Sequence, residues 1–375
     1  LEPLVTQDFS VRYLSEQEIR ELIQLLERHH SLGVLSTKSP DERFQAFAKR
    51  AERQLLVALH EATLGRPFEE IVLNEYERIE PAAARLLYLQ ICALHQFGAP
   101  VRAGLISRAS GISFERFGRE FMAPLENVVL VNDDKHTGDV SYKSRHQHVA
   151  SLVFHGALKT PEEKYDLLVG LLAHMNVDYS SDRETFSRLI KGRALVDIFP
   201  SIELGRLFYD QAEHVATNDS FLFHQRAVFE MTHPGGSLVL ADEAARRAAE
   251  SSPSNHSIEH TQAEIARRLA NETDDPLKKQ SLRRYSRQKL GSDSAKLTSY
   301  DLYTRAKVAI DELRDELTKG DSTTGKHSGA LVEAVKQAEL AIQRGRQSFP
   351  NDAQILSVEA DLRDLLTWAR KQRRL

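Results

Sequence analysis

The chain has 375 residues, of which 41% are hydrophobic and 28% charged, a balance typical of soluble globular proteins with two or three domains. Its 50 basic and 54 acidic residues give a net charge of −4, which excludes a strongly basic nucleic-acid coat protein. The single cysteine, Cys92, excludes an internal disulfide and a multi-cysteine zinc site.

The N-terminal sequence has neither an initiator methionine nor the pattern of a signal peptide. No apolar run approaches the ~18 residues that cross a bilayer. We therefore expect a cytoplasmic segment of a longer protein, with no membrane contact.

Helical periodicity dominates residues 1–98. Ser15 followed by Glu18 is the pattern of a capping box at a helix start, and Ser39-Pro40-Asp41 opens a second helix that ends at Gly65. Two more helices are expected at 68–79 and 81–97. We predict a helical lid-like bundle over residues 1–98.

A winged helix is predicted over residues 99–158. Short helices at 101–109 and 114–122 precede a β-branched run at 128–131, a turn-rich linker and a return strand at 140–142. Three helices followed by a β-hairpin is the order of elements in a winged helix. This hairpin is the β structure that the sequence predicts.

From residue 159 to 375 the pattern predicts helical repeats. Pro253 and Pro350 lie 97 residues apart, close to three lengths of the 34-residue tetratricopeptide period. Small and apolar residues match around both prolines: Ala241, Ala244 and Ala248 with Ala338, Ala341 and Gly345, and Ile258, Ala263 and Ile265 with Ile355, Ala360 and Leu362. We predict a mainly α protein ending in an α-solenoid of tetratricopeptide-like hairpins, with a generic α-bundle as the alternative. Helices are expected near 161–175, 183–198, 202–216, 219–233, 237–251, 256–271, 276–290, 299–319, 328–347 and 352–372.

DNA binding is the first function that a winged helix suggests. Arg116 and Arg119 lie on the predicted recognition helix, but Glu115 and Glu120 flank them, and residues 81–150 carry a net charge of only +2. Phosphate contacts need a concentrated basic face. A DNA-binding regulator with a helical-repeat sensor therefore stays the alternative, and a winged helix used for packing is favoured.

Two short segments partly match catalytic motifs. GDSTTGKH at 320–327 is one residue short of a phosphate-binding loop, but no strand precedes it and His327 stands where a hydroxyl should hold magnesium. HSIEH at 256–260 fits a zinc-peptidase spacing, but five residues carry little specificity. We predict no catalytic residue, no metal site and no cofactor within this segment.

The order of these elements resembles STAND-type signalling ATPases. The residues that carry the resemblance are YLSEQEIRELIQLL in the bundle and DVSYKSRHQHVASLVFH, residues 139–155, at the end of the winged helix. This resemblance implies a nucleotide-binding core in the parent protein, ATP and ADP as its ligands, and a role in antiphage or innate immunity. Some bacterial members also carry a sirtuin-like NAD-consuming effector.

By the same resemblance, His146 and its neighbour Arg145 are the candidate nucleotide-sensing residues. The family's Met-His-Asp motif is Arg145-His146-Gln147 here, so only the histidine is retained. A histidine that simply caps a helix after a strand is the alternative. The resemblance implies three kinds of partner: a protein ligand on the repeats, the nucleotide-binding core, and other copies of the protein in a homo-oligomer.

Overall fold

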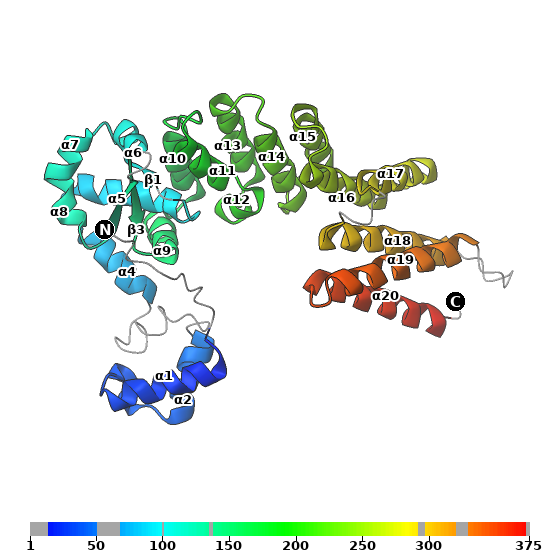
Figure 1. Cartoon of the computed structure of the whole chain (residues 1–375), viewed down its shortest axis with the longest axis horizontal. Coiled ribbons are helices and arrows are strands. Elements are labelled where there is room, and N and C mark those ends of the chain that lie inside the picture. The colour runs from blue at the N-terminus through cyan, green and yellow to red at the C-terminus, as the bar shows by residue number, and fades with distance from the viewer. Residues whose placement is uncertain are drawn as a thin grey trace. The chain divides into compact units, whose positions relative to one another are not determined.

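A computed structural model describes residues 14–50, 68–99, 101–134, 138–291, 297–319 and 329–372. It is mainly α-helical, as predicted, and strands of two, six and six residues form one small sheet in these ranges (Figure 1). The chain divides into two compact units, 1–167 and 168–375. The finer boundaries 1–98, 99–158 and 159–375 stay a prediction. None of the described helices has the length and apolarity needed to cross a bilayer.

Two serine caps begin the helices of the N-terminal segment. The Ser15 hydroxyl accepts from the Glu18 amide at the start of α1 (Glu16–Arg28), and the Glu18 carboxylate accepts from the Ser15 amide. Ser39 makes the same pair of bonds with Glu42 at the start of α2 (Pro40–Gln45). A 3-10 turn, η1 (Gly33–Thr37), lies between the helices, and a π turn, η2 (Ala46–Arg50), continues α2. The predicted extension of this second helix to Gly65 lies outside the described residues.

Helix α5 (Ala82–His95) is the central helix of the first unit. Every residue from Leu87 to His95 is buried, because α5 packs against α9 (Gln147–Ala157), the sheet and α6 (Ala103–Ser110). A helix that is apolar on all sides belongs inside a core. Helix α4 (Phe68–Glu77) also packs on α9. Cys92 is fully buried, and burial raises the pKa of its thiol to about 12.

The sheet has the order β1-β3-β2 and is antiparallel. Strands β2 (Val129–Asp134) and β3 (Asp139–Ser144) form the predicted hairpin. Strand β1 (Val101–Arg102) was predicted to begin a helix; instead Val101 pairs with Tyr142 and is fully buried, and α6 starts one residue after β1. The predicted recognition helix runs through α7 (Phe114–Arg116), a π turn η3 (Phe117–Phe121) and α8 (Met122–Leu125).

The second unit is a succession of antiparallel helices that confirms the predicted helical-repeat fold (Figure 1). Neighbouring helices pack as hairpins, namely α14 with α15, α16 with α17, and α18 with α19, and α20 then packs on α18 and α19. Alternate helices also meet, α12 with α14, α14 with α16, and α16 with α18. From α10, which crosses the boundary between the units, the helices are α10 (Pro161–Leu172), α11 (Ser180–Leu189), α12 (Gly192–Ile198), α13 (Ile202–Val215), α14 (Ser220–Thr232), α15 (Leu238–Ser251), α16 (His256–Glu272), α17 (Pro276–Lys289), α18 (Ser299–Lys319), α19 (Gly329–Ser348) and α20 (Ala353–Lys371).

One predicted helix, 183–198, is wrong as a single element, because the chain breaks between α11 and α12. At the break, Gly192 lies directly against the backbone of α14. A Cβ atom there would stand 2.4 Å from the Gln225 carbonyl oxygen and 2.6 Å from the Phe229 amide nitrogen. The Gly192 amide also donates to the Gln225 side chain at 3.1 Å. Only glycine permits this approach, and the approach fixes where α12 begins.

The small residues of the internal repeat lie where helices come closest. Ala241, Ala244 and Ala248 on α15 are buried, as are Ala338, Ala341 and Gly345 on α19. A Cβ atom on Gly345 would stand 2.7 Å from the Ile355 side chain of α20. Two details of the predicted repeat are wrong. The 97 residues between Pro253 and Pro350 span two hairpins rather than three, because α18 and α19 are 21 and 20 residues long. In addition, Ala360 is exposed, whereas its match Ala263 is buried.

Candidate functional site

The junction between β3 and α9 carries the two predicted nucleotide-sensing residues. Strand β3 ends at Ser144, whose buried hydroxyl lies 3.0 Å from the Tyr88 hydroxyl on α5. Gln147, the first residue of α9, donates to the Gln96 carbonyl at 2.6 Å. These two bonds hold the residues on either side of Arg145-His146 against the middle and the C-terminal end of α5.

His146 is the N-cap of α9. Its backbone is extended, and its Nδ1 atom accepts a hydrogen bond from the His148 amide at 3.1 Å. Because Nδ1 is the acceptor, the proton of the neutral ring lies on Nε2. The imidazole is exposed. His146 is thus a helix cap, which was the alternative reading, and its Nε2–H group remains a donor at a helix N-terminus, where anions are stabilised.

Arg145 points its charge at another helix. Its guanidinium forms an ion pair with Glu75 on α4, and the two side chains are 41% and 39% exposed. At the start of α4, about two turns from Glu75, the rings of Phe68 and of His148 on α9 stack with their centroids 6.2 Å apart. Arg145 therefore fastens α4 to the junction, and α4 and α9 are held by a charged contact and a ring contact together.

A buried histidine near this junction was missed by the sequence reasoning. His95, at the end of α5, is 8% exposed, and its Nδ1 atom has no hydrogen-bond partner among the described residues. Burial, together with the charges of Lys143 and His146, lowers its pKa to about 4. His95 is therefore neutral at physiological pH. Its place at the end of the apolar run LLYLQICALH was the available signal.

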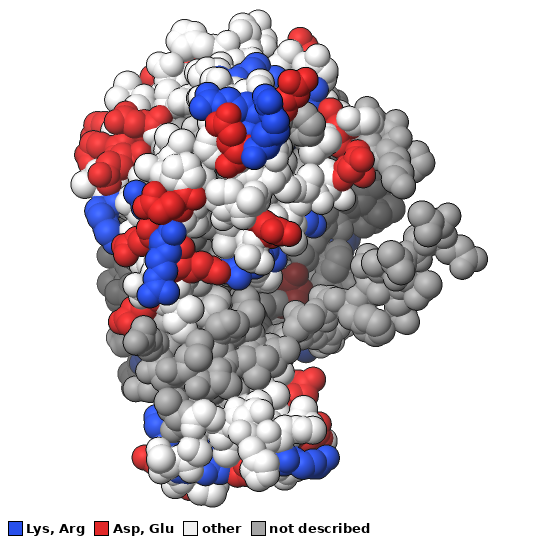
Figure 2. All heavy atoms as spheres, turned by 90° about the vertical axis from the view of Figure 1, so that its left-hand side faces the viewer, with Lys and Arg blue, Asp and Glu red and all other residues white. Residues whose placement is uncertain are grey.

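Arg116 and Arg119 are both exposed, as DNA contacts would be. Arg116, however, forms an i,i+4 ion pair with Glu120 at 2.8 Å, which neutralises one of the two charges. On the face drawn in Figure 2, described acidic and basic side chains alternate rather than gather into a basic strip. This charge distribution does not favour phosphate binding.

A groove of about 420 Å³ crosses the second unit. It is lined by α14 and α16, by residues at the start of α12 and by residues at the start of α18, so alternate helices of the array form its wall. Phe221 and Tyr300 present rings that are 38% and 48% exposed. Lys191 and Arg193 are exposed on the same wall and form no ion pair with a described residue. We call this surface the alternate-helix groove.

Three histidines of the alternate-helix groove hold neighbouring helices together. His224 on α14 lies 2.8 Å from the Thr261 hydroxyl on α16, and burial lowers its pKa. His256 lies 2.9 Å from the Asp301 carboxylate, and His260 lies 3.1 Å from the Thr304 hydroxyl. The HSIEH segment thus bonds to α18. Within the described ranges, no group of three or more His, Cys, Asp or Glu side chains is placed to hold a metal.

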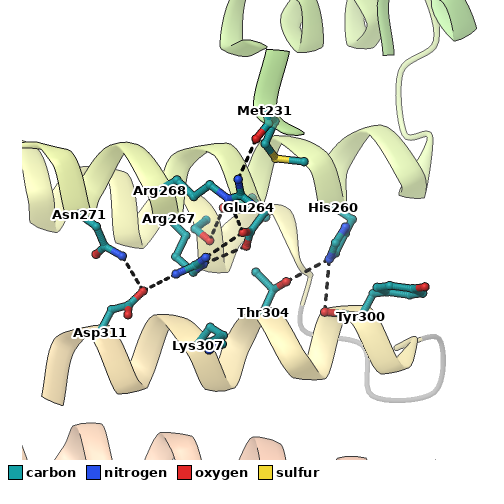
Figure 3. A network of polar contacts seen from close by, with 12 residues as sticks. Met231, His260, Glu264, Arg267, Arg268, Asn271, Tyr300, Thr304, Lys307 and Asp311 are labelled. Carbon is teal, nitrogen blue, oxygen red and sulfur yellow. Dashed lines mark hydrogen bonds and ion pairs between the residues drawn. The ribbon is translucent and has the colours of Figure 1, made fainter. Parts of the chain in front are cut away.

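A buried ionic network fixes the helices behind the groove (Figure 3). Glu264 on α16 accepts two bonds from Arg267, at 2.8 and 2.9 Å, and one from Arg268 at 2.8 Å. Arg267 reaches α18 through Asp311 at 2.6 Å, and Arg268 reaches α14 through the Met231 carbonyl at 2.8 Å. Burial alone would raise the pKa of Glu264, but the two guanidinium groups hold it below its usual value. Three alternate helices are thereby locked in register.

The segment GDSTTGKH at 320–327, which resembles a phosphate-binding loop, lies outside the described residues.

No protein-family model and no curated protein matches the chain. Among solved structures, the chain is similar to a signal transduction ATPase with numerous domains (STAND) protein with a tetratricopeptide repeat sensor from Pyrococcus horikoshii. The identity is 14% and the TM-score 0.27, over 96% of this chain and 54% of that one. The chain spans about half the length of that protein.

Proposed function

We propose that this chain is the regulatory and ligand-sensing portion of a STAND-like signalling ATPase. The observation that supports the proposal most is the alternate-helix groove. Helical repeats bind partners along such surfaces, and aromatic and arginine side chains, as in Phe221, Tyr300 and Arg193 here, are enriched where proteins bind each other. The ligand in this proposal is a protein trigger, and the setting is prokaryotic antiviral defence in the cytoplasm.

The first unit has the regulatory role in this proposal. Residues 99–158 act as a winged helix with the β2–β3 hairpin as its wing. His146 donates from Nε2 to the phosphate of ADP held by the nucleotide-binding core of the same protein, and Arg145 keeps α4 in place beside it. ATP and ADP are ligands of the parent, and the chain itself performs no chemistry. Trigger binding releases the resting state, and the parent then assembles into a homo-oligomer.

The groove is tested in the full-length protein by a phage-protection assay. Replacing Phe221 and Tyr300 together by alanine should reduce protection by about tenfold or more, because aromatic side chains dominate protein interfaces. Val239, 66% exposed on α15 and outside the groove, supplies the control Val239→Ala, which should protect normally. Full protection by the double variant would contradict the sensor assignment.

His146 is tested by nucleotide exchange, with capping and phosphate contact separated by two substitutions. His146→Ala removes both the cap and the ring, whereas His146→Ser keeps a capping oxygen and removes the ring. We expect both variants to release ADP faster and to oligomerise without a trigger. If His146→Ser retained ADP as the wild-type protein does, His146 would be a cap only.

A further inference from the structure

A second pocket in the array lies outside the alternate-helix groove. It has a volume of about 180 Å³ and is lined by α18, α19 and the C-terminal end of α17. Leu302, Ala309 and Ala341, all nearly inaccessible to solvent, contribute to its apolar lining. This space is well above what a single water molecule needs, so the pocket has room for a larger group.

Three arginines line this pocket, one from each helix: Arg287 on α17, Arg305 on α18 and Arg344 on α19. No acidic residue is among the described residues that line it. Guanidinium groups from separate helices around one apolar-lined space repel each other, because the low-dielectric wall strengthens their interaction. An anion bound among these groups would reduce their repulsion.

The acids nearby balance only part of this charge. Arg287 forms an ion pair with Glu312 on α18. Arg305 donates from Nη2 to the main-chain carbonyls of Leu290 and Gly291, and its buried Nε has no hydrogen-bond partner among the described residues. Arg344 is exposed and makes no hydrogen bond or ion pair with a described residue.

The charge of Arg305 is also unfavourable in this setting. Burial lowers the pKa of its guanidinium, the Asp301 carboxylate opposes this effect, and Arg344 adds to it. Asp301 is already engaged, because it accepts from the Thr298 amide and hydroxyl at 2.7 Å each and lies 2.9 Å from His256. Arg305 and Arg344 are therefore two cations without an ion-pair partner in the pocket.

We propose that this pocket is a binding site for a phosphate group, held by Arg305, Arg344 and Arg287. A phosphate carries about −1.5 to −2 charges near neutral pH, which matches the two uncompensated guanidinium groups. Guanidinium is the side chain best suited to bind phosphate oxygens in pairs. The phosphate is either a free ion or a group carried by a phosphorylated segment of a partner.

The site is tested by calorimetric titration of the whole chain with inorganic phosphate at low ionic strength, with acetate as the comparison anion. Phosphate should bind at least about tenfold more tightly than acetate. Arg344→Gln should weaken phosphate binding by about tenfold or more, the loss expected for charge-assisted hydrogen bonds. Arg344→Lys keeps the charge but loses the paired donors of the guanidinium group, so its affinity for phosphate should lie between those of the wild-type chain and Arg344→Gln.

The matched control is Arg363→Gln, because Arg363 is a 71% exposed arginine on α20 outside the pocket. It should bind phosphate as the wild-type chain does. A phosphoserine peptide then separates the sources: tighter binding than inorganic phosphate identifies a phosphorylated partner, and equal or weaker binding identifies the free ion. Absence of phosphate binding, or equal binding by Arg344→Gln, would overturn the proposal. These outcomes do not depend on the protein-binding role of the groove.

Discussion

Acidification should destabilise the first unit through His95. Burial lowers the pKa of its ring from 6.5 to about 4, so below pH 6.5 the unfolded chain takes up a proton that the folded chain excludes. Stability from this group is therefore present above pH 6.5 and is lost as the pH falls from 6.5 to about 4. A depression of this size corresponds to about 3 kcal/mol, which solvent screening reduces to about 2 kcal/mol.

Hydrogen exchange of the α5 amides measures this loss within the first unit alone. We compare the wild-type chain with His95→Gln at each pH, so that intrinsic exchange rates cancel. Between pH 7 and pH 4.5, protection of α5 should fall about 2 kcal/mol further in the wild-type chain than in the variant. His214→Gln, at an exposed position on α13, serves as the control and should follow the wild-type chain. Equal losses in the wild-type chain and His95→Gln would refute the reasoning.

Three further predictions concern packing, buried charge and nucleic acid. Gly192→Ala should destabilise the second unit by about 2 kcal/mol in urea unfolding, since its Cβ would meet backbone, whereas Gly170→Ala, with open space around it, should stabilise by about 0.5 kcal/mol. Glu230→Gln should lower the free energy of unfolding by about 3 kcal/mol in the same assay, because the buried Glu230 carboxylate accepts two hydrogen bonds from Arg206. Equal urea midpoints for the wild-type chain and Glu230→Gln would contradict this. In a mobility-shift assay the wild-type chain should bind no duplex DNA, so replacing Arg116 and Arg119 should change nothing.

Most helices of the chain could be predicted because their signals are local. Serine caps, proline stops and a 3.6-residue apolar period lie within a few residues of the structures they produce. Ser15 is the clearest case, since it forms the capping box with Glu18 that the sequence indicates, and Ser39 begins a helix as predicted. Strand β1 could not be predicted in the same way, because two residues carry no period and Val101 becomes a strand only by pairing with Tyr142.

The site depended on contacts between distant residues, so the sequence predicted less of it. His146 was identified through a resemblance. The structure adds that its ring accepts a hydrogen bond from the His148 amide and so caps α9. The alternate-helix groove was not predicted, because Lys191, Phe221 and Tyr300 are brought together only by the stacking of four helices. The apolar run that ends at His95 indicates burial, but it gives no sign that Lys143 and His146 lie near its ring.

The buried ionic network of Figure 3 makes the helical hairpins of the array non-interchangeable. Arg267 on α16 needs Glu264 on its own helix and Asp311 on α18. At the corresponding positions of α20, 97 residues later, the chain has Asp361 and Asp364 in place of glutamate and arginine. Placing the α20 sequence where α16 lies would leave the buried Asp311 carboxylate without the arginine that pairs with it. This ionic network therefore disfavours any order of the helices in which these charges lose their partners.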